Sequence, residues 1–255
     1  MSAPLVEMRR VSKAFGGVHA VERADLCLQA GEIVGLLGHN GAGKSTLMAL
    51  LSGALRLDEG EILVEGASAR IGSPRDARAL GIEALYQDLA LADNLPAVAN
   101  LFLGRELRGL FGLLDEAVMQ RIARGVIQQV NPHFGDFRSP VSRLSGGERQ
   151  SVAMGRALHF QAKLLILDEP TAALGPAETR QVRDLVKRLR DSGLGIVLVS
   201  HDLHDVFAVS DRVVVMQSGR VIASQSTRET SREALLQLII GGAALGRKDE
   251  PTSGS

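Results

Sequence analysis

The stretch GLLGHNGAGKST, residues 35–46, decides how this chain folds. An apolar run, Ile33 to Leu37, leads into it and predicts a buried strand. The loop is followed by TLMALLSG, a helical pattern that ends near Gly53. Between them, residues 38–45 match all eight positions of the glycine-rich loop that holds nucleotide phosphates. A turn that merely links strand to helix is the alternative, and the two flanking elements argue against it.

The loop has the chemistry for phosphate. Glycines let successive backbone N–H groups surround phosphate oxygens, and the following helix N-terminus adds partial positive charge. Lys44 supplies a point charge for the β- and γ-phosphates, and the Ser45 hydroxyl can bind Mg²⁺. These residues predict nucleotide binding but leave open what is done with the nucleotide.

A second stretch, LLILDEPTAALG at residues 164–175, places two carboxylates at the end of an apolar strand. Asp168 there is expected near the Mg²⁺, and Glu169 is expected to orient and deprotonate a water. Gln87 ends another expected strand and can contact metal and water, and His201 can hydrogen-bond the γ-phosphate. A polar strand end that faces solvent, or a structural Gln or His, is the alternative for each.

Strands alternate with helices along most of the chain, which predicts an α/β fold with a mostly parallel sheet and an antiparallel β region at the N-terminus. The strand rhythm is missing from about 88 to 160, so we expect a helical subdomain inserted into the core. Residues 1–245 are expected to form one domain, followed by a disordered polar tail, 246–255.

Composition narrows the class of protein. Lys+Arg and Asp+Glu both number 29, so no basic field favours nucleic acid. The single cysteine, Cys27, has no internal disulfide partner. No apolar run approaches the roughly 20 residues that span a bilayer. We therefore expect any membrane role to depend on partners.

The stretch LSGGERQ, residues 144–150, is a second helix start with unblocked backbone N–H groups. One nucleotide has little use for two anion-binding loops on one subunit, whereas two subunits packed head to tail can use both. In the order GHNGAGKST, Gln87, LSGGERQ, LILDEP and SHD, the chain resembles the ATP-binding subunits of ABC transporters over residues 4 to 240.

This resemblance implies an ATPase, with ATP and Mg²⁺ as cofactors, that dimerises around two ATP molecules and drives transmembrane permease subunits. It implies Glu169 as general base, His201 as γ-phosphate sensor, and Gln87 as a catalytic contact that links the γ-phosphate to the transmembrane coupling surface. Ser45, Gln87 and Asp168 match the metal contacts. The positions that match nucleotide contacts are Phe15, Gly38, Asn40, Gly41, Gly43, Lys44, Ser45, Thr46, Ser145, Gly146 and Gly147.

The segment from Asn100 to Glu106 is similar to a run found in bacterial sugar importers of the ribose/xylose/fructose type. That likeness implies carbohydrate uptake, a solute-binding protein that acts indirectly, and a homodimer peripheral to the cytoplasmic face of the plasma membrane. Import of another small solute, such as branched-chain amino acids, and a soluble non-transport ABC ATPase are the alternatives.

The chain departs from the family pattern at two places. Glu148 stands where the family often has Gln, and Gly175 stands where the family usually has Asp. The resemblance implies that this carboxylate reaches across the dimer, so its absence at Gly175 bears on communication between the two ATP sites and not on ATP binding.

Two further assignments stay open. Phe15 matches the aromatic that stacks on adenine, but an aromatic in an N-terminal strand also suits the core. The apolar side chains of the segment from Leu95 to Arg105 suit either contact with the membrane subunit or the core of the insertion, and Phe102 is the residue on which to test this.

Overall fold

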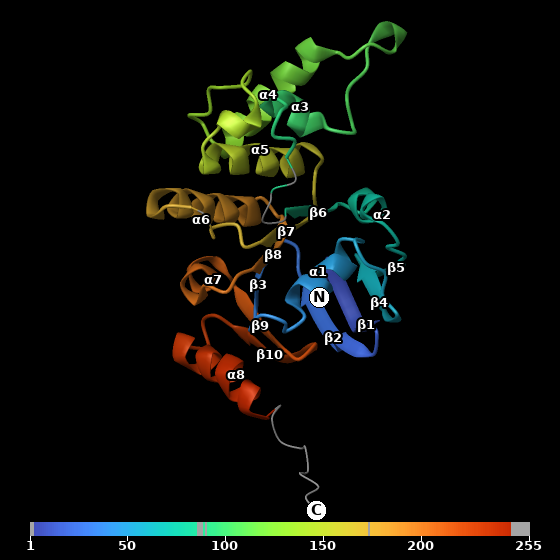
Figure 1. The fold of residues 1–255 in the computed structure, drawn as a ribbon, viewed down its shortest axis with the longest axis vertical. Helices are drawn as coiled ribbons and strands as arrows, with labels where there is room; N and C mark the ends of the chain where they lie inside the picture. Colours follow the sequence, from blue (N-terminus) through green and yellow to red (C-terminus); the bar gives the residue numbers. More distant parts are fainter. Residues whose placement is uncertain (1–2, 86–88, 90, 173, 246–255) are drawn as a thin grey trace, which may run out of the picture.

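In the computed structural model, residues 3–85, 89, 91–172 and 174–245 are described. The N-terminal region is an antiparallel sheet with the order β2-β1-β4-β5 (Figure 1). Its strands are β1 (Val6–Phe15), β2 (Val18–Leu28), β4 (Glu59–Val64) and β5 (Ala67–Ala69). The expected antiparallel β region is confirmed.

A six-stranded sheet, in the order β10-β9-β3-β8-β7-β6, forms the centre of the molecule. Its strands are β3 (Ile33–Leu37), β6 (Ile82–Leu85), β7 (Leu164–Asp168), β8 (Gly195–Val199), β9 (Arg212–Gln217) and β10 (Arg220–Ser226). Neighbouring strands run parallel from β9 to β6, and β10 is antiparallel to β9. The prediction of a mostly parallel sheet is confirmed.

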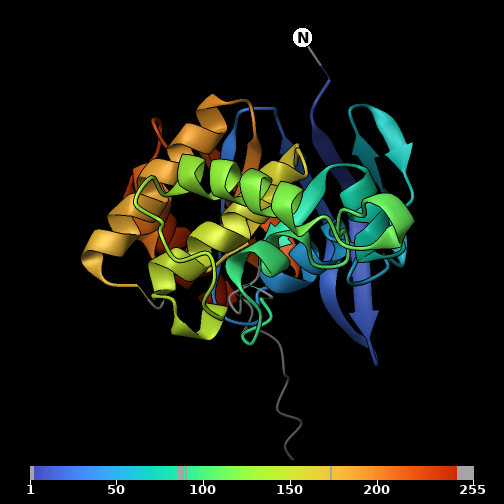
Figure 2. The ribbon, with the colours of Figure 1, turned by 90° about the horizontal axis from the view of Figure 1, so that it is seen from above.

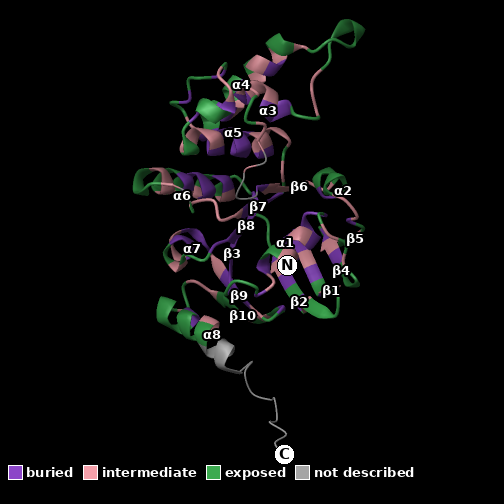
Figure 3. Cartoon of the chain, in the orientation of Figure 1, coloured by how far each residue is buried: buried purple, intermediate pink, exposed green. Residues whose placement is uncertain are grey.

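Alternate residues of the central strands enter two different cores. In β3, Val34 and Leu36 pack with α1 (Lys44–Leu51) and with the antiparallel sheet. Ile33 and Leu37 face the opposite core. That core also holds residues of α6 (Pro176–Asp191), α7 (Leu203–Val209) and α8 (Arg232–Leu245). Because both faces are covered, the central strands are buried along their length (Figure 3).

The helical segment lies between β6 and β7 in the chain and beyond one edge of the central sheet (Figures 1 and 2). It consists of α3 (Ala97–Phe102), η1 (Leu110–Gly112), α4 (Glu116–Val130), η2 (Val141–Arg143) and α5 (Gly146–His159). It has a core of its own, with Phe102, Ile127 and Phe134 at most 1% exposed. A short helix, α2 (Pro74–Ala79), precedes β6.

The apolar face of α6 is buried through Val182, Leu185 and Val186, and the Ser231 hydroxyl caps α8 by accepting a hydrogen bond from the backbone of Ala234 at 3.1 Å. The strand expected to end at Gln87 is described as far as Leu85, and Gln87 and the tail 246–255 lie outside the described residues. Among the residues that are described, no helix is long and apolar enough to cross a bilayer.

Candidate nucleotide site

The glycine-rich loop lies between the end of β3 and the start of α1, as the sequence predicts. Gly43 caps α1 with a φ of 100°, a left-handed conformation that favours glycine. A Cβ atom there would lie 2.4 Å from the backbone oxygen of Ala20. The loop therefore depends on this glycine both for its conformation and for its close contact with β2.

Lys44, the first residue of α1, is buried and lies inside the loop. Its ammonium group donates hydrogen bonds to the backbone oxygens of Gly38 at 2.8 Å and His39 at 3.1 Å. Burial lowers the pKa of Lys44, although the charges of Glu169 and Asp168 oppose that shift. The buried ammonium is thus an incompletely compensated positive charge in a backbone cradle, as an anion site requires.

The two carboxylates at the end of β7 differ in their backbone. Asp168 still pairs with Val199 of β8. At Glu169 the chain turns, with a φ of 51°, and its backbone N–H donates to the oxygen of Val199 at 2.9 Å. Left-handed backbone is costly for a residue with a side chain, and such residues cluster at functional sites. The turn sends the two adjacent side chains in different directions.

Glu169 and His201 meet across the ends of β7 and β8. The Oε1 atom of Glu169 lies 2.7 Å from Nδ1 of His201 and accepts a hydrogen bond from the His201 backbone N–H at 2.9 Å. Because an ionised carboxylate only accepts, this pairing places the imidazole proton on Nδ1. The other oxygen, Oε2, has a 3.5 Å contact with the hydroxyl of Ser200, at the limit of hydrogen bonding. Oε2 therefore stays available to a water.

Asp168 is half-buried, and burial raises its pKa, with a further contribution from the charge of Glu169 and an opposing one from Lys44. A carboxylate in that position favours a nearby cation. Together with the exposed Ser45 hydroxyl in the first turn of α1, it offers hard oxygen donors of the kind that Mg²⁺ prefers. The residues present fit a Mg²⁺ ion that takes its other ligands from phosphate and water.

The LSGGERQ stretch starts α5. Ser145 is its N-cap, and Ser145 and Glu148 form a capping box in which the Glu148 carboxylate accepts from both the backbone N–H and the hydroxyl of Ser145 at 2.9 Å. The backbone N–H groups of Gly146 and Gly147 fall in the first helical turn, where no intrahelical acceptor exists. Ser145 and Gly146 are exposed, so this helix start is accessible from outside the subunit.

The turn after Glu169 is held by α5 as well as by its own helix. The amide of Gln150, 4% exposed, donates to the backbone oxygen of Pro170 at 2.5 Å. The Glu178 carboxylate, in the first turn of α6, accepts from the backbone N–H of Gly175 at 3.0 Å and so fixes the residue that precedes the helix. Neither Gln150 nor Glu178 was predicted as a site residue, although Gln150 belongs to the quoted LSGGERQ stretch.

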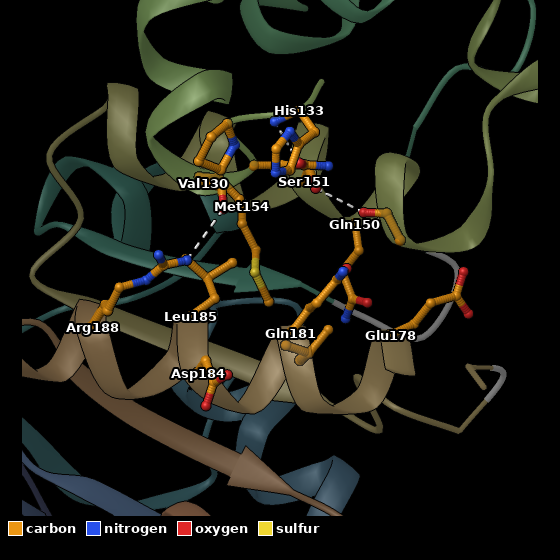
Figure 4. A pocket seen from close by; sticks show the side chains of 14 residues that line it. Val130, His133, Gln150, Ser151, Met154, Glu178, Gln181, Asp184, Leu185 and Arg188 are labelled. Atoms are coloured by element: carbon orange, nitrogen blue, oxygen red, sulfur yellow. Dashed lines mark hydrogen bonds between the residues drawn. The ribbon is translucent and has the colours of Figure 1, made fainter. Parts of the chain in front are cut away.

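A cavity separates the start of α5 from α6, with residues of the loop after α4 above it (Figure 4). Ser151 and Met154 enter it from α5, and Glu178 and Gln181 from α6. Across its far end, Arg188 of α6 donates to the backbone oxygen of Val130 at 3.4 Å. The helical segment and the core therefore meet here with space between them, bridged by a few polar contacts.

The remaining predicted positions differ in exposure. Phe15, at the end of β1, is 48% exposed, and the Lys13 ammonium lies 5.6 Å from its ring centre. The ring is therefore available for stacking and does not belong to the core. Asn40 and Gly41 are exposed in the loop, and Thr46 is partly buried in the first turn of α1.

The segment from Leu95 to Arg105 divides between the two alternatives. Leu101 and Phe102 are fully buried, so the test residue Phe102 belongs to the core of the helical segment. Leu103, which follows the end of α3, is 46% exposed. Leu103 and Arg105 line a cleft between the helical segment and the core, opposite Arg78 of α2.

Residues 21–172 match the family model described as ABC transporter. The chain is 39% identical to the xylose/arabinose import ATP-binding protein of Sulfolobus acidocaldarius, covering 96% of this chain and 98% of that one. It is 42% identical to a ribose import ATP-binding protein of Rubrobacter xylanophilus, covering 93% of this chain and 47% of that protein.

Several other import proteins also match over slightly less than half of their own length, so the chain spans about half of those relatives. Among solved structures, a nucleotide-free ATP-binding cassette from an ABC transporter has a TM-score of 0.77 at 22% identity, covering 91% of this chain and 97% of that one. That likeness concerns the fold. The match to the family model and the long alignment with the Sulfolobus protein show that this chain belongs to the ABC transporter family of ATP-binding proteins.

Proposed function

We propose that this chain is the ATP-hydrolysing subunit of an importer that carries a sugar, and that two copies close around two ATP molecules on the cytoplasmic face of the membrane. The observation that carries the proposal is the pairing of Glu169 with His201 at the strand ends, beside the loop that holds Lys44. The carboxyl ends of neighbouring strands thus bring together a base, an imidazole and a buried ammonium. These groups suit the attack of water on a terminal phosphate.

Each residue has a distinct task in this reaction. Lys44 and the loop N–H groups bind and orient the phosphates, and Phe15 stacks on the base. Oε2 of Glu169 takes a proton from the attacking water, while Oε1 remains bonded to His201. Ser45 and Asp168 would hold Mg²⁺, which when bound would supply positive charge to the phosphate oxygens. Gln87 stays a proposed contact to metal and water.

The helix start at Ser145 supports the dimer. Its first-turn N–H groups favour an anion, and it is exposed on the surface of the single subunit. In the proposed dimer, Ser145, Gly146 and Gly147 bind the γ-phosphate held by the partner copy. Because each site is then completed by the other subunit, hydrolysis and dimerisation depend on each other.

The proposed partner is a transmembrane permease, with a solute-binding protein acting through it. The cleft lined by Leu103, Arg105 and Arg78 supports this part, because it combines an exposed apolar side chain with positive charge where the helical segment meets the core. A cytoplasmic segment of a permease seated there would contact both parts of the subunit. The similar proteins from Sulfolobus and Rubrobacter are a xylose/arabinose and a ribose import ATP-binding protein, which supports a pentose as cargo.

Reconstitution tests the proposal. The purified chain, combined in proteoliposomes with a pentose permease and its solute-binding protein, should hydrolyse ATP faster when the binding protein is loaded with pentose. Uptake of labelled pentose should need ATP. Hydrolysis that responds to branched-chain amino acids but to no sugar would contradict the proposal that the cargo is a sugar. Absence of hydrolysis would contradict the proposal that the chain is an ATPase.

A further inference from the structure

Asp205 is a buried carboxylate of α7 to which the proposed reaction gives no part. It is 5% exposed, although it lies four residues after the exposed His201. Its Oδ1 atom accepts a hydrogen bond from Nε of Arg183 at 2.9 Å, and the same guanidinium makes a second contact with Oδ1 through Nη2. Its Oδ2 atom accepts a hydrogen bond from the hydroxyl of Thr171. Both oxygens are therefore in use.

These contacts join three segments around the predicted catalytic pair. Thr171 lies two residues after Glu169, and Arg183 belongs to α6, which begins at Pro176. Asp205 belongs to the helix that follows His201. One carboxylate thus ties both flanks of the turn to the segment that carries the histidine. All three residues line one cavity together with Glu169 and His201.

The helix that carries Asp205 is itself anchored to the end of β8. Asp202 caps α7 by accepting from the backbone N–H of His204 at 2.7 Å, and the hydroxyl of Ser200 accepts from the backbone N–H of Asp202 at 3.0 Å. Nδ1 of His204 lies 2.9 Å from Nη2 of Arg183. A displacement of Asp205 would therefore also displace the backbone at His201.

We infer that Asp205 is a positioning residue for ATP hydrolysis. Through Thr171 and Arg183 it holds Glu169 and His201 at the mutual geometry that activates water. The inference rests on the proposed function, in which Glu169 is the base. Glu169 has left-handed backbone, a conformation that persists only where the surrounding structure holds it.

Stability alone gives a weak reason for this network. A buried ion pair often adds no more to stability than apolar residues of similar volume, because both charges lose their hydration. A geometric role is a stronger reason, since displacement of a reacting group by about 1 Å can lower a rate by about 10²-fold. The hydroxyl of Thr171 binds Asp205, and Thr171 lies only two residues after the proposed base, Glu169.

Thr171→Val tests that link while leaving the Arg183–Asp205 pair in place. We expect kcat for ATP to fall by about ten- to a hundredfold, while the Kd for ATP changes by less than about twofold. Thr171→Ser restores the hydroxyl and should hydrolyse ATP within about threefold of the parent rate. If Thr171 had only a structural role, Thr171→Val would not lower kcat while leaving the Kd for ATP unchanged, and Thr171→Ser would not selectively restore kcat.

Asp205→Asn gives the second measurement, with Glu32→Gln as its matched control. The control removes a carboxylate from a partly buried pair elsewhere in the chain, Arg212–Glu32 at 2.8 Å, in which Arg212 begins β9. Thermal unfolding of both variants corrects for loss of folded protein. Per folded molecule, Asp205→Asn should lose at least about tenfold in kcat and Glu32→Gln should lose none.

Parent-like kcat in Thr171→Val, or equal losses in Thr171→Val and Thr171→Ser, would overturn the inference. Glu169→Gln, measured beside them, separates this failure from failure of the proposed function. If Glu169→Gln hydrolyses ATP at the parent rate, the base itself is wrongly assigned. If only Glu169→Gln is impaired, the base stands and the positioning role of Asp205 is refuted.

Discussion

Replacing Glu169 by Gln removes a proton acceptor with little change in shape. The amide oxygen can still accept from the backbone N–H of His201, which donates to Oε1 at 2.9 Å in the parent chain. What is lost is the carboxylate that takes the proton of the attacking water. The variant should therefore fold and bind ATP while it fails in turnover.

The size of the effect follows from the role. A general base contributes about 10²–10⁴-fold, which corresponds to about 2.7–5.4 kcal/mol at about 1.36 kcal/mol per factor of ten. The structure adds a second effect, because the charge of Glu169 helps to raise the pKa of Asp168. The proposed metal ligand of the parent chain thus takes up a proton at a higher pH than an ordinary aspartate. Without that charge, Asp168 should stay ionised to lower pH.

Two assays check both effects. Phosphate release under saturating ATP gives the turnover, and light scattering with ATP detects the dimer, which should accumulate because the closed state no longer hydrolyses its nucleotide. Titration of Mg²⁺–ATP binding at descending pH should show affinity lost at lower pH in Glu169→Gln than in the parent. Glu65→Gln, at an exposed carboxylate paired with Lys163, is the control. Turnover at the parent rate would contradict the role of Glu169 as general base, and an unchanged acid limb of binding would contradict its effect on the pKa of Asp168.

Four other substitutions test separate parts of the subunit. Phe15→Ala should weaken ATP binding by about 1–3 kcal/mol, the value of one base–aromatic stack, with little change in the unfolding midpoint because the ring is exposed; calorimetry measures both. Phe102→Ala should cost about 3–5 kcal/mol of folding stability in chemical denaturation, whereas Leu103→Ala should keep stability and ATPase activity and lose sugar uptake. Glu148→Gln keeps an acceptor for Ser145 and removes a negative charge from the helix start, so ATP-driven dimerisation, followed by light scattering, should strengthen.

Features carried by neighbouring residues could be predicted from the sequence. The strand at Ile33–Leu37 is apolar throughout because both of its faces are buried, and the loop after it contains glycines where the backbone is left-handed. Asp168 and Glu169 likewise follow from one strand and its end. Such patterns need no knowledge of what packs against them.

Features that depend on distant contacts could not be predicted in this way. The helix from Ala177 to Asp191 has the pattern of an ordinary amphipathic surface helix, and its buried face agrees with that. Yet Arg183, one of its many charges, pairs with the buried Asp205, 22 residues away. Periodicity indicates which face is apolar, but it does not show which charged side chain at its border meets a partner.

The division within the segment from Leu95 to Arg105 has a similar cause. Phe102 and Leu103 are adjacent and both apolar, and helical periodicity alone does not separate them. The helix ends at Phe102, and Leu103 has extended backbone, with a φ of −52° and a ψ of 116°. The point at which the helix ends therefore decides which side chain enters the core and which reaches the cleft.

The missing carboxylate at Gly175 has a different meaning once these contacts are considered together. Within one subunit, Gln150 of α5 donates to the backbone oxygen of Pro170, Glu178 accepts from the backbone N–H of Gly175, and Asp205 accepts from the hydroxyl of Thr171. The turn is thus attached both to the helix start proposed to face the partner's ATP and to the segment that carries the histidine of its own site. A side chain at position 175 is one way to link the two sites across the dimer, and the contacts through the turn are another. Communication in this chain is therefore expected to pass through the body of each subunit.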